Sequence, residues 1–328
     1  MQTISVALCV YNGGLFLEGQ LKSIAAQTTQ PNELIICDDQ STDDSIIIIN
    51  NFRRIAPFPV IFFVNETQLG STKNFEKAIK LCSGDIIVLA DQDDVWVPDK
   101  LLIIHNTFTE TEETVMTFSD ALVVDEELKP LGYSLWNVMK FTKHQQTLAM
   151  NGYLYKVLLK HNVITGATMA FRGSCKQFIL PVDPLWVHDA WIAFILSTIN
   201  KTALINIPLV MYRQHSSNQI GAKKLSFIKK IHRTQKRIVD RFYFLQHEMY
   251  NNAYLHLIQM GTDCSKMTAL RSKVKHLQIR SKVFCNKTSI FSCFGDFFRL
   301  RYHRFSSGLP SFLEDLFSWL YYWYFAKR

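Results

Sequence analysis

Residues 86–97 read Ile86-Ile87-Val88-Leu89-Ala90-Asp91-Gln92-Asp93-Asp94-Val95-Trp96-Val97, an apolar run followed directly by a cluster of aspartates. Its first five residues form a short apolar run bounded by polar residues, which predicts a buried strand. The aspartates follow at once, so they lie where that strand ends. Mg²⁺ and Mn²⁺ prefer oxygen ligands and need few protein carboxylates when substrate phosphates supply the rest. The pair Asp91 and Asp93 fits such a site, and an acidic loop that only caps the following helix is the alternative.

Before this stretch, apolar runs alternate with helix-like segments at a regular spacing. Strands are predicted at residues 3–10, 33–37, 60–64 and 85–90, and helices at 15–26, 43–54 and 72–82. Alternation of this kind predicts an α/β fold with a mainly parallel, doubly wound sheet. Ligands bind such sheets beyond the carboxyl ends of the strands, and every predicted strand end here is polar.

After residue 110 the pattern is less regular. Strands are predicted at 115–119, 122–124 and 163–171, a helix at 190–198, and a strand pair at 203–212 that Pro208 interrupts. From about residue 224 long amphipathic helices are predicted. We therefore divide the chain into residues 1–222, with a nucleotide-binding half to about 110 and an acceptor-binding half at 111–222, and a helical extension at 223–328.

Charge is distributed unevenly along the 328 residues. Residues 223–328 carry 20 Lys plus Arg against 6 Asp plus Glu, or +14, which leaves 16 against 22, or −6, for residues 1–222. The seven cysteines are scattered and form no disulfide or zinc pattern, and the first residues enter a strand without a signal sequence. These features predict a cytoplasmic protein whose basic end meets an anionic partner.

Several short motifs occur in an order and spacing that resemble the family 2 inverting glycosyltransferases, which have the GT-A fold. The likeness covers roughly residues 3–220 and is closest to bacterial rhamnosyltransferases of surface-polysaccharide synthesis. Its motifs are Val10-Tyr11-Asn12, residues 37–43, Asn65 with residues 70–74, residues 83–85, residues 90–96, Thr165-Gly166-Ala167, His188-Asp189 and residues 212–218.

The resemblance implies that the amino-terminal motifs bind a nucleotide-sugar donor. A carboxylate at Asp38 or Asp39 can accept the N3–H of uracil or thymine, which favours a pyrimidine donor, although both aspartates could instead only shape a turn. The resemblance places Asp91 at the ribose and Arg213 at the diphosphate. The remaining nucleotide-binding candidates are Val10, Tyr11, Asn12, Asn65, Lys73 and Asn74. Solvent exposure is the alternative for Lys73.

Inverting transfer needs a base for the acceptor hydroxyl and a cation for the leaving diphosphate. By resemblance Asp189 is the base, with His188 where the family usually has Glu, and Asp93 and His215 are the metal ligands. The expected cofactor is therefore Mn²⁺ or Mg²⁺. The acceptor-binding candidates are Thr165, Gly166, Ala167, His188, Trp96 and Trp191. Core packing is the alternative for both tryptophans, and ordinary helix-terminal roles for Asp189 and His188.

The carboxyl-terminal third combines basic and aromatic residues. Residues 312–325 are dense in aromatics but include Glu314 and Asp315 and are too short to span a bilayer, so we expect a helix in the interface at the inner face of the cell membrane. A helical packing domain or a homodimer surface is the alternative. Nucleic acid is not an expected partner, because no DNA- or RNA-binding motif accompanies the charge.

These features predict a peripheral-membrane glycosyltransferase that passes L-rhamnose from dTDP-rhamnose to a polysaccharide or lipid-linked oligosaccharide. Transfer of a hexose or N-acetylhexosamine from a UDP donor is the first alternative. The second is a sugar- or nucleotide-binding scaffold without catalytic activity.

Overall fold

The computed structural model describes residues 2–215, 242–262, 264–283 and 288–326. The chain divides into two compact units, one formed by Met1–Leu154 with Val163–Ala222, the other by Tyr155–Asn162 with Lys223–Arg328. The second unit thus takes in eight residues that the sequence analysis placed in the acceptor-binding half.

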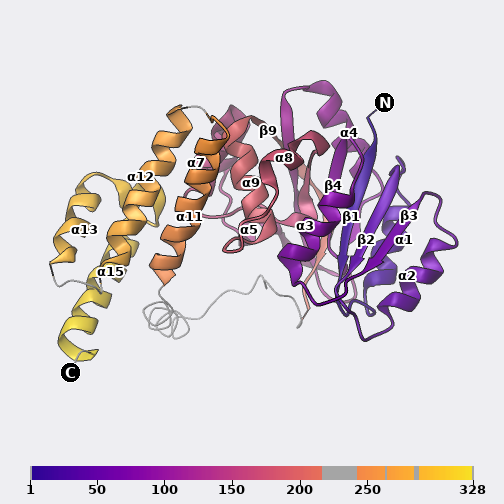
Figure 1. Ribbon diagram of the computed structural model, residues 1–328, viewed down its shortest axis with the longest axis horizontal. Coiled ribbons are helices and arrows are strands. Elements are labelled where there is room, and N and C mark those ends of the chain that lie inside the picture. Colours follow the sequence, from indigo (N-terminus) through magenta and orange to yellow (C-terminus); the bar gives the residue numbers. More distant parts are fainter. Residues whose placement is uncertain (1, 216–241, 263, 284–287, 327–328) are drawn as a thin grey trace. The chain divides into compact units, whose positions relative to one another are not determined.

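A mixed sheet forms the centre of the first unit (Figure 1). Its strands are β1 (Ile4–Val10), β2 (Glu33–Asp38), β3 (Val60–Val64), β4 (Ile86–Ala90), β5 (Val95–Trp96), β6 (Thr114–Val124), β7 (Pro130–Ser134), β8 (Met169–Arg172) and β9 (Lys201–Arg213). They lie in the order β3-β2-β1-β4-β8-β6-β9-β5, and β7 pairs with β6. β1 to β4 are mutually parallel, and β8 runs antiparallel to both β4 and β6. This arrangement confirms the predicted GT-A-like class.

β1 and β4 are buried on both sides because helices cover both faces of the sheet there. The helices of the first unit are α1 (Leu17–Ala25), α2 (Ser45–Arg53), α3 (Ser71–Leu81), α4 (Lys100–Glu110), α5 (Leu135–Val138), α6 (Lys143–Leu148), α8 (Lys176–Ile179) and α9 (His188–Ile199), while α7 (Leu154–Leu158) crosses into the second unit. Alternate β1 residues, from Ile4 to Val10, pack in one cluster with apolar residues of α1, α2 and α4. α3 contacts β1, β2 and α9.

Three segments differ from the sequence prediction. β6 is one strand, not two, because an irregular register around Asp120 lets it continue. β9 likewise runs unbroken through Pro208, where the register with β6 shifts. The predicted strand at 163–171 begins instead with a single 3₁₀ turn, Gly166–Thr168, before β8.

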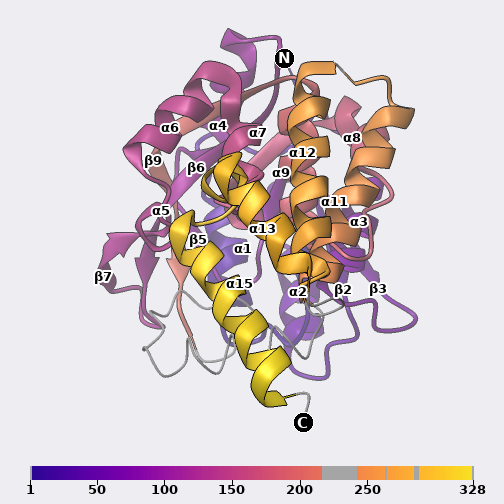
Figure 2. The same cartoon turned by 90° about the vertical axis from the view of Figure 1, so that its left-hand side faces the viewer.

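The second unit contains α11 (Phe242–Gln259), α12 (Cys264–Ser281), α13 (Ser289–Phe298), α14 (Arg301–Phe305), α15 (Leu309–Tyr321) and a π-helical turn, Tyr322–Ala326. α11 and α12 lie side by side, and α13 and α15 pack on each other (Figure 2). A core around Cys293, Tyr302 and Phe312 holds the last helices together. Residues 225–241 of the predicted amphipathic helix lie outside the described part.

Candidate active site

The D-x-D loop lies at the carboxyl edge of the sheet, next to the end of β1. Gln92 bonds the backbone of Tyr11 twice, accepting from its N–H at 2.8 Å and donating to its carbonyl at 3.0 Å. A Cβ at Gly13 would lie 2.5 Å from the Gln92 amide oxygen, so a larger residue would displace this side chain from its bonds to Tyr11. The loops that follow β1 and β4 are therefore one rigid unit.

Asp91, Asp93, Asp94 and Asp189 form an acidic cluster at this edge. Burial and the negative charges of Asp93 and Asp189 raise the pKa of Asp91 to about 7. Burial, Asp93 and Asp91 raise the pKa of Asp94 well above its usual value. The structure thus brings the D-x-D motif and the proposed base into one electrostatic neighbourhood, although about 100 residues of sequence separate them.

The end of β9 completes the cluster. His215 Nε2 lies 2.8 Å from Asp93 Oδ2, and the imidazole ring packs on Phe16 with centroids 4.9 Å apart. Arg213 is buried: its backbone N–H donates to Asp94 Oδ1 at 3.0 Å, and its guanidinium donates to the carbonyls of Asp93, at 2.8 Å, and Glu126. These bonds fasten Arg213 to the D-x-D loop. They use guanidinium N–H groups that the sequence analysis expected to donate to the diphosphate.

Asp189 lies in the first turn of α9, with its carboxylate held by backbone amides. Its Oδ2 accepts from the Gly166 N–H at 3.2 Å and its Oδ1 from the Ala190 N–H. His188 is buried, its ring stacks on Phe75 with centroids 4.1 Å apart, and burial lowers its pKa. Thr165-Gly166-Ala167 and His188-Asp189 therefore form one contact region, as an acceptor-side site requires.

The loops after β2 and β3 are fastened together by buried polar side chains. Asp39 accepts three hydrogen bonds, from Asn65 Nδ2 at 2.8 Å, from the Leu69 N–H at 2.7 Å and from the Gly70 N–H at 2.8 Å. Asn74 accepts from Asn65 and donates to the Cys37 carbonyl. Asn65 and Asn74 thus join the loop after β3 and the start of α3 to the end of β2.

The turns that follow β1 and β2 are joined in the same way. Asp38 is buried at the end of β2 and accepts from both the N–H and the hydroxyl of Ser41. Asn12, in the left-handed region with φ 47°, accepts from the Thr42 N–H and donates its own N–H to Ser41. Val10 is buried at the end of β1, whereas the Tyr11 side chain is 44% exposed and free to meet a ligand's ring.

Three other predicted site residues have their contacts outside the acidic cluster. Lys73 pairs with Glu76 at 2.6 Å on α3. Trp96 is buried with the Lys100 ammonium 3.7 Å from its ring centroid, and Trp191 is buried and donates to the Ile179 carbonyl at 2.8 Å. Both tryptophans are placed in the core, which is the alternative that the sequence left open for them.

Two further residues belong to the site but were not among the predicted ones. Lys100 is fully buried. The sequence signal for its burial is its helical spacing with Ile104 and Phe108, which places it on the apolar face of α4. Tyr212 lies on β9 near all four aspartates: burial and the charges of Asp94 and Asp91 raise its pKa, so its hydroxyl stays a hydrogen-bond donor.

The residues present can hold a divalent cation only together with a substrate. Among the described residues, no group of three or more His, Cys, Asp or Glu side chains has the arrangement of a metal site. Asp93 and His215 nevertheless place an oxygen and a nitrogen 2.8 Å apart on a rigid loop and strand end. That pair fits Mn²⁺ or Mg²⁺ if phosphate oxygens and water supply the other ligands.

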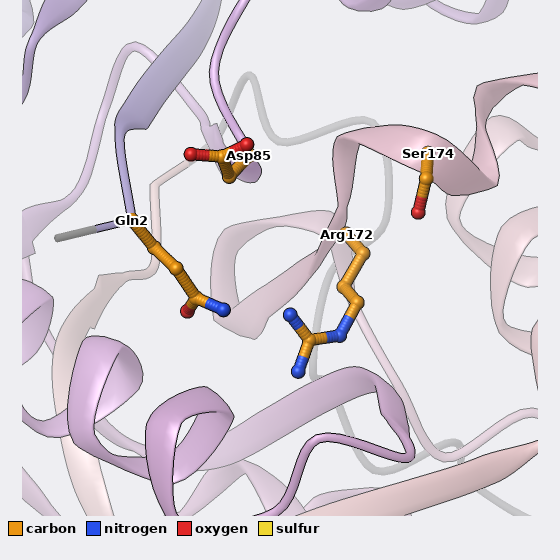
Figure 3. Close-up of a pocket in the computed structure, with 4 residues that line it drawn as sticks. All are labelled: Gln2, Asp85, Arg172 and Ser174. Carbon is orange, nitrogen blue, oxygen red and sulfur yellow. The ribbon is translucent and has the colours of Figure 1, made fainter.

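A separate depression is lined by Gln2, Asp85, Arg172 and Ser174 (Figure 3). Asp85 and Gln2 precede β4 and β1, so it lies at the amino ends of the strands, opposite the D-x-D loop. Arg172 donates to the carbonyls of Thr114 and Phe108, and Asp85 accepts from Thr3. These bonds fasten strand ends, and we assign the chemistry to the acidic cluster instead.

Comparison with known proteins agrees with this geometry. The model of the family Glycosyl transferase family 2 matches residues 5–158. The chain is 34% identical over 253 residues, 74% of its length, to UDP-Glc:alpha-D-GlcNAc-diphosphoundecaprenol beta-1,3-glucosyltransferase WfaP of Escherichia coli, of which it covers 93%. It is 27% identical over 228 residues to dTDP-rhamnosyl transferase RfbG of Shigella flexneri, covering 66% of this chain and 74% of that one.

Among solved structures, S. aureus TarS 1-349 in complex with UDP-GlcNAc superposes with a TM-score of 0.58 and 13% identity. The match covers 98% of this chain and 81% of that one. At such identity the likeness concerns the fold alone.

Proposed function

The chain belongs to glycosyl transferase family 2, and from that premise we propose that it transfers a sugar, with inversion, from a pyrimidine nucleoside diphosphate to a hydroxyl of a glycan or lipid-linked acceptor. The observation that carries the proposal is that Asp189 and the end of β4 meet at one turn: the Cβ position of Gly166 lies 3.8 Å from both Asp189 Cβ and Leu89 Cδ1, two residues before Asp91. Inverting transfer requires a base and a diphosphate site on either side of one anomeric carbon, and we assign these roles to Asp189 and to the D-x-D loop.

In the proposed step, the acceptor hydroxyl oxygen bonds to the anomeric carbon while the bond from that carbon to the diphosphate oxygen breaks. The hydroxyl proton passes to the Asp189 carboxylate, and the nucleoside diphosphate leaves with the bonding electron pair. Two backbone N–H groups fix the Asp189 carboxylate, so it is oriented before the acceptor arrives. General base catalysis of this kind contributes about 10²- to 10⁴-fold to the rate.

Asp93 and His215 would hold Mn²⁺ or Mg²⁺ together with the donor's diphosphate. The bound cation supplies neutralisation of the charge that develops on the leaving phosphate. This chain's own part is to hold both ligands rigidly, through the Arg213 bond to the Asp93 carbonyl and the packing of His215 on Phe16.

Base recognition is assigned to Asp38 and Asp39, and ribose recognition to Asp91. A carboxylate offers about four acceptor positions. Three protein donors occupy those of Asp39, which leaves one for the N3–H of a pyrimidine, whereas Asp38 is 0% exposed and both its oxygens accept from Ser41, so of the two we favour Asp39. Tyr11, exposed beside them, provides a ring for the base to stack on.

Two donors are supported by separate observations. The motif resemblance and the 27% identity to a dTDP-rhamnosyl transferase favour dTDP-L-rhamnose. The 34% identity over most of a UDP-Glc-dependent glucosyltransferase favours UDP-glucose. We propose dTDP-L-rhamnose as the first donor to test and UDP-glucose as the second.

The test is a donor panel of dTDP-rhamnose, UDP-glucose, UDP-GlcNAc and GDP-mannose with Mn²⁺ and lipid-linked oligosaccharide acceptors. We expect transfer from one pyrimidine donor and a loss of about 10²- to 10⁴-fold in Asp189→Asn. Asp85→Asn is the matched control, because Asp85 lies at the other end of β4 and its carboxylate, among the described residues, accepts hydrogen bonds from Thr3 alone. Full transfer by Asp189→Asn, or a preference for the GDP donor, would contradict the proposal.

We also propose that the helical unit binds the inner face of the cell membrane. None of the described helices is long and apolar enough to cross a bilayer. However, α13 and α15 expose apolar side chains at helical spacing, namely Phe291, Phe294, Phe298, Leu309, Leu313, Phe317 and Leu320. Phe294 and Phe297 both pack on the α15 residue Phe312, so the two helices are adjacent.

Positive charge near the exposed apolar side chains of α13 and α15 favours an anionic membrane as their binding partner. Arg299, which follows Phe298 in the sequence, and Arg304 are exposed, and Arg near an apolar face attracts anionic lipid. We expect the chain to co-sediment with phosphatidylglycerol vesicles but not with phosphatidylcholine vesicles.

Binding should fall in Phe298→Ser and Phe317→Ser, whose side chains are 78% and 67% exposed. Ile55→Ser, at a position 80% exposed in the other unit, is the control. Unchanged sedimentation of both variants, or a concentration-dependent dimer that they abolish, would assign the face to another partner.

A further inference from the structure

Lys100 is the first residue of α4 and is 0% exposed. A lysine is almost never buried completely unless its ammonium has partners. Here Nζ donates to the Ala167 carbonyl at 2.8 Å and lies 3.7 Å from the centroid of the Trp96 ring. Both partners are themselves buried, so the ammonium is committed to the interior.

The Ala167 carbonyl belongs to the short 3₁₀ turn Gly166–Thr168. The preceding residue, Gly166, donates its N–H to Asp189 Oδ2 at 3.2 Å. Lys100 and Asp189 therefore bind backbone groups of two consecutive residues, Ala167 and Gly166. A shift of the Ala167 carbonyl would move the amide that orients the proposed base.

Lys100 also lies beside the D-x-D loop, because Trp96, whose ring its ammonium contacts, is only two residues after Asp94. Burial lowers the pKa of Lys100 to about 7, while the negative charges of Asp94 and Asp91 oppose that shift. The nitrogen donates a hydrogen bond in either protonation state. One side chain thus lies between the D-x-D loop and the turn that holds Asp189.

We propose that Lys100 is a positioning residue for sugar transfer: it fixes the Gly166–Thr168 turn against the D-x-D loop and so sets the orientation of Asp189. This inference rests on the proposed function. Its consequence is that Lys100 acts on transfer through Asp189 and contributes little to donor binding, since the residues assigned to the nucleotide are fastened by other bonds.

A purely structural role is the competing explanation, and the helical unit offers a matched control for it. Lys273 is buried, donates to the Phe305 carbonyl at 2.9 Å and lies 4.9 Å from the Tyr250 ring centroid. Burial also lowers its pKa to about 7. Lys273→Met therefore removes the same kind of ammonium from a place that the proposed chemistry does not use.

The experiment is a double-mutant cycle of Lys100→Met with Asp189→Asn in the full chain, with Lys273→Met alongside. We measure transfer kcat and acceptor KM, nucleoside diphosphate Kd with Mn²⁺ by calorimetry, and the thermal unfolding midpoint. Lys100→Met should lower kcat by about 10²-fold, the scale of a misplaced catalytic group. The nucleotide Kd should change by less than about threefold, and in the Asp189→Asn background the same substitution should cost less than about threefold in kcat. Lys100→Gln, which keeps an N–H donor, replaces Lys100→Met in the cycle if the latter does not fold.

Several results would overturn the inference alone, given a wild type that transfers sugar. The first is a kcat loss in the double variant that equals the product of the two single-variant losses. The second is a loss of nucleotide affinity in Lys100→Met as large as its loss of kcat. The third is a kcat loss in Lys273→Met as large as that in Lys100→Met. A wild type that transfers no sugar from any donor would instead overturn the proposed function, and this inference with it.

Discussion

Replacing Gly166 with alanine should displace the turn that orients Asp189. A Cβ at this position would lie 3.1 Å from His188 Nε2 and 3.8 Å from both Asp189 Cβ and Leu89 Cδ1. The 3.1 Å contact requires a neighbour to move by a few tenths of an ångström. The His188 ring cannot easily move, because it is buried and stacked on Phe75. The turn must move instead.

The magnitude follows from this geometry. Overpacking a buried site by one methyl group costs about 1–3 kcal/mol of folding free energy. The bond from Gly166 N–H to Asp189 Oδ2 is already 3.2 Å long, so a small displacement takes it beyond ordinary hydrogen-bond length. Since a 1 Å error in a catalytic group costs about 10²-fold, we expect transfer kcat to fall about tenfold. Nucleotide affinity should not change.

Transfer kinetics, nucleotide calorimetry and chemical denaturation of Gly166→Ala test this reasoning. Gly19→Ala is the control: its Cβ would lie 3.9 Å from Val95, so alanine should stabilise α1 by about 0.5–1 kcal/mol and leave kcat alone. Adding His188→Ala should restore part of the lost stability by making room. Native stability and full kcat in Gly166→Ala, or no recovery in the double variant, would refute the argument.

Three other substitutions test separate parts of the molecule. His215→Asn should raise the Mn²⁺ concentration needed for half-maximal donor binding by about 10- to 100-fold, and an unchanged titration would contradict its assignment as a ligand. Asp39→Asn weakens three hydrogen bonds that fasten the loop at Leu69 and Gly70, so denaturant unfolding should show a loss of about 1.5–3 kcal/mol, and no loss would disprove this role. Burial lowers the pKa of His276 to about 4, below the unfolded value of about 6.5, so its neutral form contributes stability above pH 6.5 that is lost as the pH falls toward 4. The unfolding free energy should therefore fall by up to about 3 kcal/mol more in the wild type than in His276→Gln over that range. Parallel curves of unfolding free energy against pH would exclude this contribution of His276.

The sequence predicts the first four strands well because each is a short apolar run between turn residues. Their parallel pairing also predicts that Tyr11, Asp38, Asn65 and Asp91 lie at one edge, since parallel strands end on the same side. The acceptor half is harder to predict. Pro208 breaks the local strand pattern, yet the strand continues because β6 absorbs the irregularity through a register shift. That compensation is made by another strand and leaves no local signal.

Side-chain roles are predicted less well than positions. A lysine at a helix start is ordinarily solvated. Lys100 is buried instead, and its ammonium is satisfied by the Ala167 carbonyl, which lies far away in the sequence. Trp96 was proposed for the acceptor on its residue type, whereas α4 packs its ring under that same lysine. Arg213 fits phosphate in sequence, but its neighbours in space are the carbonyls of Asp93 and Glu126. These outcomes depend on contacts between segments far apart in the chain.

Buried charge alone does not mark a functional site in this molecule, because the helical unit also contains it. There, however, the carboxylate of Asp315 accepts two bonds from Arg280 and one from Tyr302, so the charge is satisfied within the protein. In the acidic cluster, Asp94 Oδ2 is buried without a hydrogen-bond partner among the described residues. Leaving such a group unsatisfied costs about 1–3 kcal/mol or more. The contrast separates a polar core whose charges are satisfied by their neighbours from a cluster that keeps a buried carboxylate oxygen without a hydrogen bond.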